Sequence, residues 1–208
     1  MSNPWLNVPL ADYEGHMDSP GVAQLRALSD LFAQALALCH PESVIILGIA
    51  GGNGLEHIDA NITKRVVGLD TNPSYLDAAR RRFPMLPGLE LHCLDLAQPL
   101  SVLSTPAQLV HAALVFEHAG VGFCLDNAIS LVGPGGALSV VLQLPSDSTE
   151  AVSSTPFASM RNLSAHFSFV NPSDLRQTLE RCGFPLTHET RTALPAGKAF
   201  WMGIFRRQ

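Results

Sequence analysis

A glycine-rich turn and an aspartate are the residues with which this chain could bind a nucleotide-like cofactor. The apolar run 43–47 is followed at once by glycines at positions 48, 51, 52 and 54. Glycine lacks a Cβ atom and adopts positive φ at low cost, so this turn can bring backbone amides close to a flat ligand. Asp70 closes the next apolar run and could accept hydrogen bonds from a ribose diol, a contact of roughly 1.5 to 3 kcal/mol. The alternative is that Asp70 caps the helix that follows it.

Other titratable residues could act on a substrate. Glu117 and His118 follow a later apolar run, in L-V-F-E-H, and either could take a proton from a hydroxyl or an amine. The alternative is that both only line a pocket or cap the next helix. Tyr13 and His16 could fold across the site from the amino-terminal segment, and His166 could line an acceptor pocket. Alternatively, these three are loop or core residues without a role in the chemistry.

Apolar runs and helical patterns alternate along the first two thirds of the chain, which predicts a parallel sheet with helices on both faces. The expected strands are 44–47, 65–69, 89–94, 109–115 and 137–142, and the expected helices are 20–39, 55–59, 72–83 and 121–132. Right-handed crossovers place the carboxyl ends of parallel strands on one rim. The glycine turn, Asp70 and Asp95 should therefore lie together.

The two ends of the chain do not follow this alternation of strands and helices. A helix is predicted over 171–182, and the extended runs 186–194 and 199–205 must pair antiparallel because the connection between them is short. Residues 1–18 show no steady period, so we expect an arm there and not a helix or strand. We interpret 144–170 as a lid and acceptor region. The turn Gly133-Pro134-Gly135-Gly136 should lead into the strand at 137.

Length and composition favour one domain over residues 1–208. A net charge of −5 without a basic stripe argues against a nucleic-acid partner. The four cysteines are far apart, which predicts neither a metal site nor a disulfide framework. Without a long apolar run or a basic leader segment, we expect no membrane span and a cytoplasmic location. The sequence carries no signal of oligomeric state.

The spacing of small residues separates two classes of cofactor. A dinucleotide fingerprint from Gly48 would need a third glycine at position 53, where this chain has Asn53. Small residues fall instead at 48, 50, 52 and 54. In L-G-I-A-G-G-N-G, in V-V-G-L-D-T-N-P around Asp70 and in L-H-C-L-D-L around Asp95, the sequence resembles the class I S-adenosylmethionine-dependent methyltransferases. The segment L-V-G-P-G-G-A-L is similar to that family as well, and these motifs span roughly residues 43 to 143.

The resemblance implies a Rossmann-like, doubly wound, mostly parallel seven-stranded sheet with a carboxyl-terminal antiparallel hairpin. It implies S-adenosylmethionine as cofactor, S-adenosylhomocysteine as product and a small molecule as methyl acceptor. Asp95 would meet the adenine amino group. The cofactor-binding residues that it implies are Gly48, Ile49, Ala50, Gly51, Gly52, Gly54, Asp70, Thr71, Asp95, Leu96 and Ala113.

Two other functions remain open from the sequence. One is a protein that binds S-adenosylmethionine without transferring the methyl group. The other is an NAD(P)-dependent reductase, which would share the first strand and Asp70 but needs a different glycine spacing and usually a tyrosine-lysine pair, which is not evident here.

Overall fold

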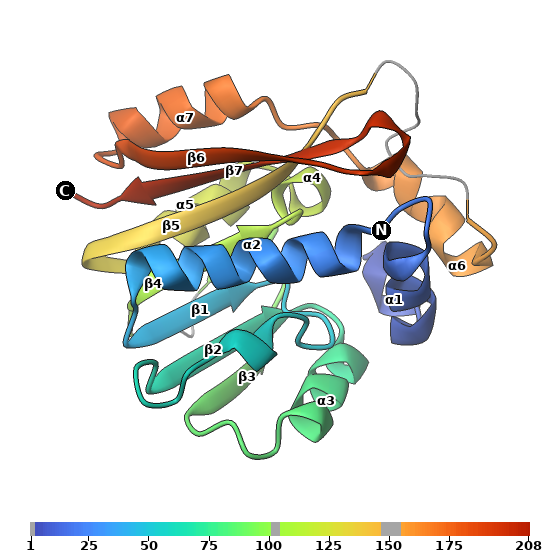
Figure 1. The fold of residues 1–208 in the computed structure, drawn as a ribbon, viewed down its shortest axis with the longest axis horizontal. Coiled ribbons are helices and arrows are strands. Elements are labelled where there is room, and N and C mark those ends of the chain that lie inside the picture. The colour runs from blue at the N-terminus through green and yellow to red at the C-terminus, as the bar shows by residue number, and fades with distance from the viewer. Residues whose placement is uncertain (1–2, 101–104, 147–154) are drawn as a thin grey trace.

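The sheet that carries these segments has seven strands in the order β3-β2-β1-β4-β5-β7-β6 (Figure 1). The computed structural model describes residues 3–100, 105–146 and 155–208. The strands are β1 (Ser43–Leu47), β2 (Arg65–Asp70), β3 (Leu89–Cys93), β4 (Ala107–Ala113), β5 (Val132–Leu144), β6 (Leu186–Ala193) and β7 (Ala199–Arg206). β7 runs antiparallel to both of its neighbours, and the other pairs are parallel. The predicted sheet and its closing hairpin are confirmed.

Helices cover both faces of this sheet because its central strands are apolar on both sides. Along β1, Val44 and Ile46 belong to the core formed with α2 (Gln24–Cys39) and α3 (Pro73–Arg82). Ile45 and Leu47 belong to the core formed with α5 (Gly122–Leu131) and α7 (Pro172–Arg181). The other helical segments are α1 (Leu10–Asp18), α4 (Phe116–Ala119), α6 (Ala158–Arg161), η1 (Pro4–Asn7), η2 (Leu55–His57), η3 (Asn162–His166) and η4 (Pro195–Gly197), where η marks a 3₁₀ helix.

The amino-terminal segment is not the arm that the sequence predicts, because residues 10–18 form helix α1. Its side chains at Tyr13 and Met17 pack against the core around α2. Gly15 breaks the apolar pattern, but a Cβ atom there would lie 2.7 Å from the ring of Phe157. The glycine thus permits a close approach between α1 and the segment before α6, and these two helices lie side by side beyond the strand ends (Figure 1).

Two further boundaries differ from the sequence prediction. Helix α2 begins at Gln24 and not near residue 20, because the Ser19 carbonyl accepts hydrogen bonds from the amides of Val22 and Ala23 and closes a turn. The segment Gly133-Pro134-Gly135-Gly136 lies inside β5 and does not precede it. It accommodates a register shift against β4, where Ala107 pairs with Val132 but Leu109 pairs with Ala137.

The predicted lid and acceptor region, 144–170, lies partly outside the described residues, since 147–154 are not among them. Its second half contains α6 and η3, which pack near the amino terminus. No helix in the described part of the chain is both long and apolar enough to span a membrane.

Two helices begin with the same sequence, Asn-Pro-Ser, and offer a matched test of how the amino terminus is held. The Asn72 and Asn171 side chains each accept the backbone amide two residues on, at 3.0 Å and 2.8 Å. Asn72 also donates to the Trp5 carbonyl at 2.9 Å. Asn171→Ala should lower the free energy of unfolding by about 1 kcal/mol, the usual effect of losing a cap. Asn72→Ala should lower it by about 2 kcal/mol, because two more hydrogen bonds are lost, the one to the Trp5 carbonyl and the one from the Ser74 hydroxyl at 2.7 Å. Urea denaturation measures both, and equal losses would contradict the tether to Trp5.

Candidate functional site

The glycine turn after β1 has the open geometry that its sequence predicts. The amides of Gly48 and Ile49 donate to the Leu69 carbonyl at 2.8 and 3.0 Å, which joins the turn to the end of β2. Gly48 has φ +70°, and a Cβ atom there would lie 2.8 Å from the Val115 side chain. Ala50 also has a positive φ, 48°, which is unfavourable for a residue with a Cβ atom. Its conformation therefore needs support from outside the turn.

Asp70 provides that support. One carboxylate oxygen accepts the Ala50 amide at 2.9 Å, and the other accepts the Asn72 amide at 2.9 Å. The side chain is 7% exposed, and burial raises the pKa of its carboxyl, while hydrogen bonds from the backbone amides partly oppose that rise. Asp70 therefore joins the glycine turn to the start of α3. The cap of α3 itself is Asn72, so Asp70 supports the cap residue and does not cap the helix. Asp70 also lines a cavity.

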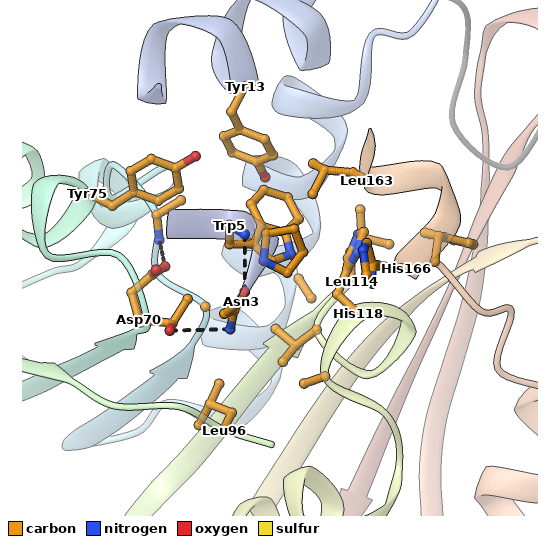
Figure 2. A pocket seen from close by; sticks show the side chains of 18 of the residues that line it. Asn3, Trp5, Tyr13, Asp70, Tyr75, Leu96, Leu114, His118, Leu163 and His166 are labelled. Atoms are coloured by element: carbon orange, nitrogen blue, oxygen red, sulfur yellow. Dashed lines mark hydrogen bonds between the residues drawn. The ribbon is translucent and has the colours of Figure 1, made fainter. Parts of the chain in front are cut away.

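That cavity has a volume of about 420 Å³ and opens along the carboxyl ends of β1, β2 and β4 (Figure 2). Seven of the eleven predicted cofactor residues line it: Gly48, Ala50, Asp70, Thr71, Asp95, Leu96 and Ala113. The other four belong to the same turn but do not line the cavity. The Ile49 side chain is buried over Gly68, and Gly52 and Gly54 lie against the rings of Phe83 and Phe32. The Gly51 carbonyl accepts a hydrogen bond from Arg82 at 3.3 Å.

The amino-terminal segment forms one wall of this cavity. The Asn3 side chain donates to the Thr71 hydroxyl at 3.4 Å, close to Asp70 (Figure 2). Glu14 on α1 forms an ion pair with Arg82 on α3, and one of the two hydrogen bonds in that pair is 2.8 Å long. Because Arg82 also contacts the glycine turn, α1 is connected to the predicted cofactor end by hydrogen bonds and not only by apolar packing.

The structure separates the two predicted catalytic residues. His118 lines the cavity, where its ring lies edge-on between Trp5 at 4.8 Å and Phe167 at 5.3 Å, measured between ring centres. Burial, together with the charge of nearby His166, lowers the pKa of His118 to about 4, so its imidazole is neutral at physiological pH. Its Nδ1 atom is buried and has no hydrogen-bond partner among the described residues.

Glu117 does not line the cavity. Its side chain is 1% exposed, and one carboxylate oxygen accepts the Gln143 amide at 2.8 Å. The other oxygen is buried without a partner in the described part of the chain. Burial raises the pKa of Glu117 to about 7, against the hydrogen bonds from backbone amides. Glu117 therefore connects α4 to the end of β5.

The predicted substrate residues all reach the cavity, since Tyr13, His16 and His166 line it. Sequence reasoning missed several residues beside them, chiefly Trp5, Gln24, Tyr75, Gln143 and Lys198. Trp5 lies in a segment without periodicity, Gln24 is the first residue of the amphipathic α2, and Gln143 lies near the end of the apolar β5. A polar residue interrupting a buried strand, as Gln143 does in β5, is the one signal that could have indicated them.

No protein-family model and no curated protein sequence matches the chain. Solved structures do match it. The N-methyltransferase NodS from Bradyrhizobium japonicum WM9, in complex with S-adenosyl-L-homocysteine, is 16% identical with a TM-score of 0.67, and the match covers 99% of each chain. The magnesium protoporphyrin IX methyltransferase ChlM from Synechocystis PCC 6803, with S-adenosylmethionine bound, is 14% identical with a TM-score of 0.70, covering 99% of this chain and 95% of that one.

A third similar structure carries out a different reaction. The [4+2]-cyclase SpnF is 12% identical with a TM-score of 0.66, and the match covers 89% of this chain and 82% of that one. The chain therefore has the fold of the S-adenosylmethionine-dependent methyltransferases, as its motifs predict. The cyclase is a reminder that function depends on the site and not on the fold.

The buried Glu117 carboxyl predicts a specific pH dependence of stability. The pKa of Glu117 in the folded protein is about 7, above the ordinary value of 4.5. Protonation of Glu117 therefore contributes its whole share to the free energy of unfolding below pH 4.5, and this share is lost as the pH rises through 7. Glu117→Gln keeps the acceptor for the Gln143 amide and removes this titration. Relative to the wild type, the variant should gain roughly 2 to 3 kcal/mol between about pH 5 and pH 8. Denaturant unfolding at both pH values measures the gain, with the exposed Glu42→Gln as control. A difference independent of pH would contradict the burial of this charge.

Proposed function

We propose that this protein binds S-adenosylmethionine at the carboxyl ends of β1, β2 and β4 and transfers its methyl group to a small molecule. One observation carries the proposal. A single cavity of about 420 Å³ has the glycine turn and Asp70 among its lining residues and also the titratable residues of α1 and α4. Such a cavity can hold a cofactor and an acceptor in contact with each other.

The residues at the glycine turn fit this cofactor. Asp70 and Asp95 bring negative charge, which complements the positively charged sulfur and amine of S-adenosylmethionine. Each Asp70 oxygen accepts one backbone amide and retains capacity for a second hydrogen bond, so anchoring the turn is compatible with binding a ribose diol. The Tyr75 hydroxyl is buried on a lining residue and has no partner among the described residues, which leaves it able to bind a ligand.

When bound, S-adenosylmethionine supplies a methyl group on positive sulfur, and the electron pair of the methyl–sulfur bond stays on sulfur as the acceptor forms the new bond. The protein contributes mainly alignment, an effect that can reach roughly 7 to 11 kcal/mol. His118 is the group that we assign to accept the proton that the acceptor loses, because its imidazole is neutral and its ring is held by Trp5 and Phe167. The burial that lowers its pKa to about 4 also makes it a weaker base than an exposed histidine. Glu117 is not part of this step and supports α4.

A substitution at Asp70 tests whether the site binds the proposed cofactor. Asp70→Asn removes the charge and replaces one of the two oxygens that accept the Ala50 and Asn72 amides by a donor, so the affinity for S-adenosylhomocysteine should fall about ten-fold or more. The control is Asp77→Asn, because Asp77 is an exposed residue that pairs with Arg80 on α3. Isothermal titration calorimetry with the wild type and both variants measures the change. Tight binding of NAD without binding of S-adenosylhomocysteine would favour the reductase and contradict the proposal.

Transfer of a labelled methyl group separates an enzyme from a protein that only binds the cofactor. We expect label from S-adenosylmethionine to enter small molecules when the protein is incubated with cell extract, and not to enter protein or nucleic acid sorted by size. His118→Phe preserves the ring packing between Trp5 and Phe167 and removes the base, so it should slow transfer about 10²-fold or more while leaving S-adenosylhomocysteine affinity unchanged. Absence of any labelled product would identify a binding protein, and an unchanged rate in the variant would exclude His118 as the base.

A further inference from the structure

One buried hydroxyl beside the cavity has no hydrogen-bond partner. Tyr75 is the third residue of α3, it lines the cavity, and it is only 2% exposed. Its hydroxyl oxygen is buried and binds nothing in the described part of the chain. Burying a phenol O–H without an acceptor is unfavourable, so its place beside a cavity favours a ligand that accepts a hydrogen bond.

The surrounding contacts fix the Tyr75 ring in place. It stacks with the ring of Tyr13 on α1, with 6.2 Å between the ring centres and 24° between the ring planes. The helix turn that carries Tyr75 is capped by Asn72, which accepts the Ser74 amide at 3.0 Å and donates to the Trp5 carbonyl at 2.9 Å. Packing and capping therefore position the hydroxyl before any ligand binds, as a binding residue requires.

The position of Tyr75 indicates which part of the cofactor it would meet. Figure 2 shows Asp70 between Leu96 and Tyr75. Tyr13, on which Tyr75 stacks, also lines a smaller cavity together with residues of the glycine turn. In the proposed site the adenine lies near Asp95 and the ribose at Asp70. The amino-acid part of the cofactor then extends away from Leu96, over the glycine turn and toward Tyr75.

That part of the cofactor carries a carboxylate and an ammonium group, and the hydroxyl can distinguish them. An ammonium group has only donors, so it would leave the Tyr75 O–H without an acceptor, whereas a carboxylate accepts it. Burial is the largest cause that raises the pKa of Tyr75, and the charges of Asp70 and Glu14 add to it, so the phenol keeps its proton. Neither of these carboxylates is without a partner, because Glu14 pairs with Arg82 and Asp70 accepts two backbone amides.

We infer that the Tyr75 hydroxyl donates a hydrogen bond to the carboxylate of bound S-adenosylmethionine and selects for a cofactor that carries this group. The inference rests on the proposed function and adds a residue to the cofactor site. Tyr75 does not touch the reacting atoms, so it determines affinity and takes no part in the methyl transfer. The motif around Asp70 does not indicate it, because a tyrosine in the first turn of an amphipathic helix is equally typical of a core residue.

Two ligands and one variant isolate this hydrogen bond. The ligands are S-adenosylhomocysteine and its decarboxylated analogue, which keeps the adenine, the ribose, the sulfur and the ammonium group. Tyr75→Phe keeps the ring that stacks on Tyr13 and removes the hydroxyl. By isothermal titration calorimetry on the full chain, the variant should bind S-adenosylhomocysteine about ten-fold or more weakly and the analogue within about two-fold of the wild type. Asp77→Asn, at an exposed position on the same helix, should change neither affinity.

Stability should change in the opposite direction. Because the hydroxyl is buried without a partner, Tyr75→Phe should raise the urea concentration at which half of the ligand-free protein unfolds. A tyrosine with only a structural role would not weaken ligand binding while strengthening the fold. Urea denaturation of the wild type and the variant without ligand measures this change.

The outcomes separate the inference from the function on which it rests. If neither ligand binds to the wild type, the proposed function fails. If S-adenosylhomocysteine binds but Tyr75→Phe weakens both ligands equally, or weakens neither, the inference is overturned and the proposed function stands. A Tyr75→Phe variant that does not fold, or that is less stable than the wild type without ligand, would also overturn it, because the hydroxyl would then be needed by the fold itself.

Discussion

The hydrogen bonds of Asp70 to the amides of Ala50 and Asn72 hold together the part of the molecule on which the site depends. They join the turn after β1 to the start of α3, and they stabilise a positive φ at Ala50 that an alanine would otherwise avoid. Because the carboxylate is buried, each of these hydrogen bonds is made in a medium where an unpaired charge would be costly. Asp70 also lines the cavity, so the side chain that supports the turn is the one proposed to bind the ribose.

The sequence predicts the central sheet well because its signals there are local and repeated. Apolar runs, the Asn72-Pro73 cap and the short connection before β7 each specify an element without reference to the rest of the chain. It fails for α1, a nine-residue helix that packs against the core around α2 and, through Gly15, against Phe157, which is more than a hundred residues away. Tertiary contacts of this kind leave no period in the sequence.

In the candidate site, too, the sequence predicts some residues and misses others. The motifs predict the cofactor-binding residues, and seven of the eleven line the cavity, while Ile49, Gly51, Gly52 and Gly54 belong to the same turn without lining it. The pair Glu117 and His118 is adjacent in the sequence, but successive residues point in different directions, so only His118 reaches the cavity. The sequence could not predict that Lys198 and Gln24 line one cavity, because only the folded sheet and α2 bring them there.

A crystal structure of the protein with S-adenosylhomocysteine is the most direct test of the proposed site. We expect the ligand at the carboxyl ends of β1 and β2, with its ribose hydroxyls within hydrogen-bonding distance of the Asp70 carboxylate and its sulfur directed toward His118. A ligand bound elsewhere, or bound in this cavity with its ribose away from Asp70, would contradict it.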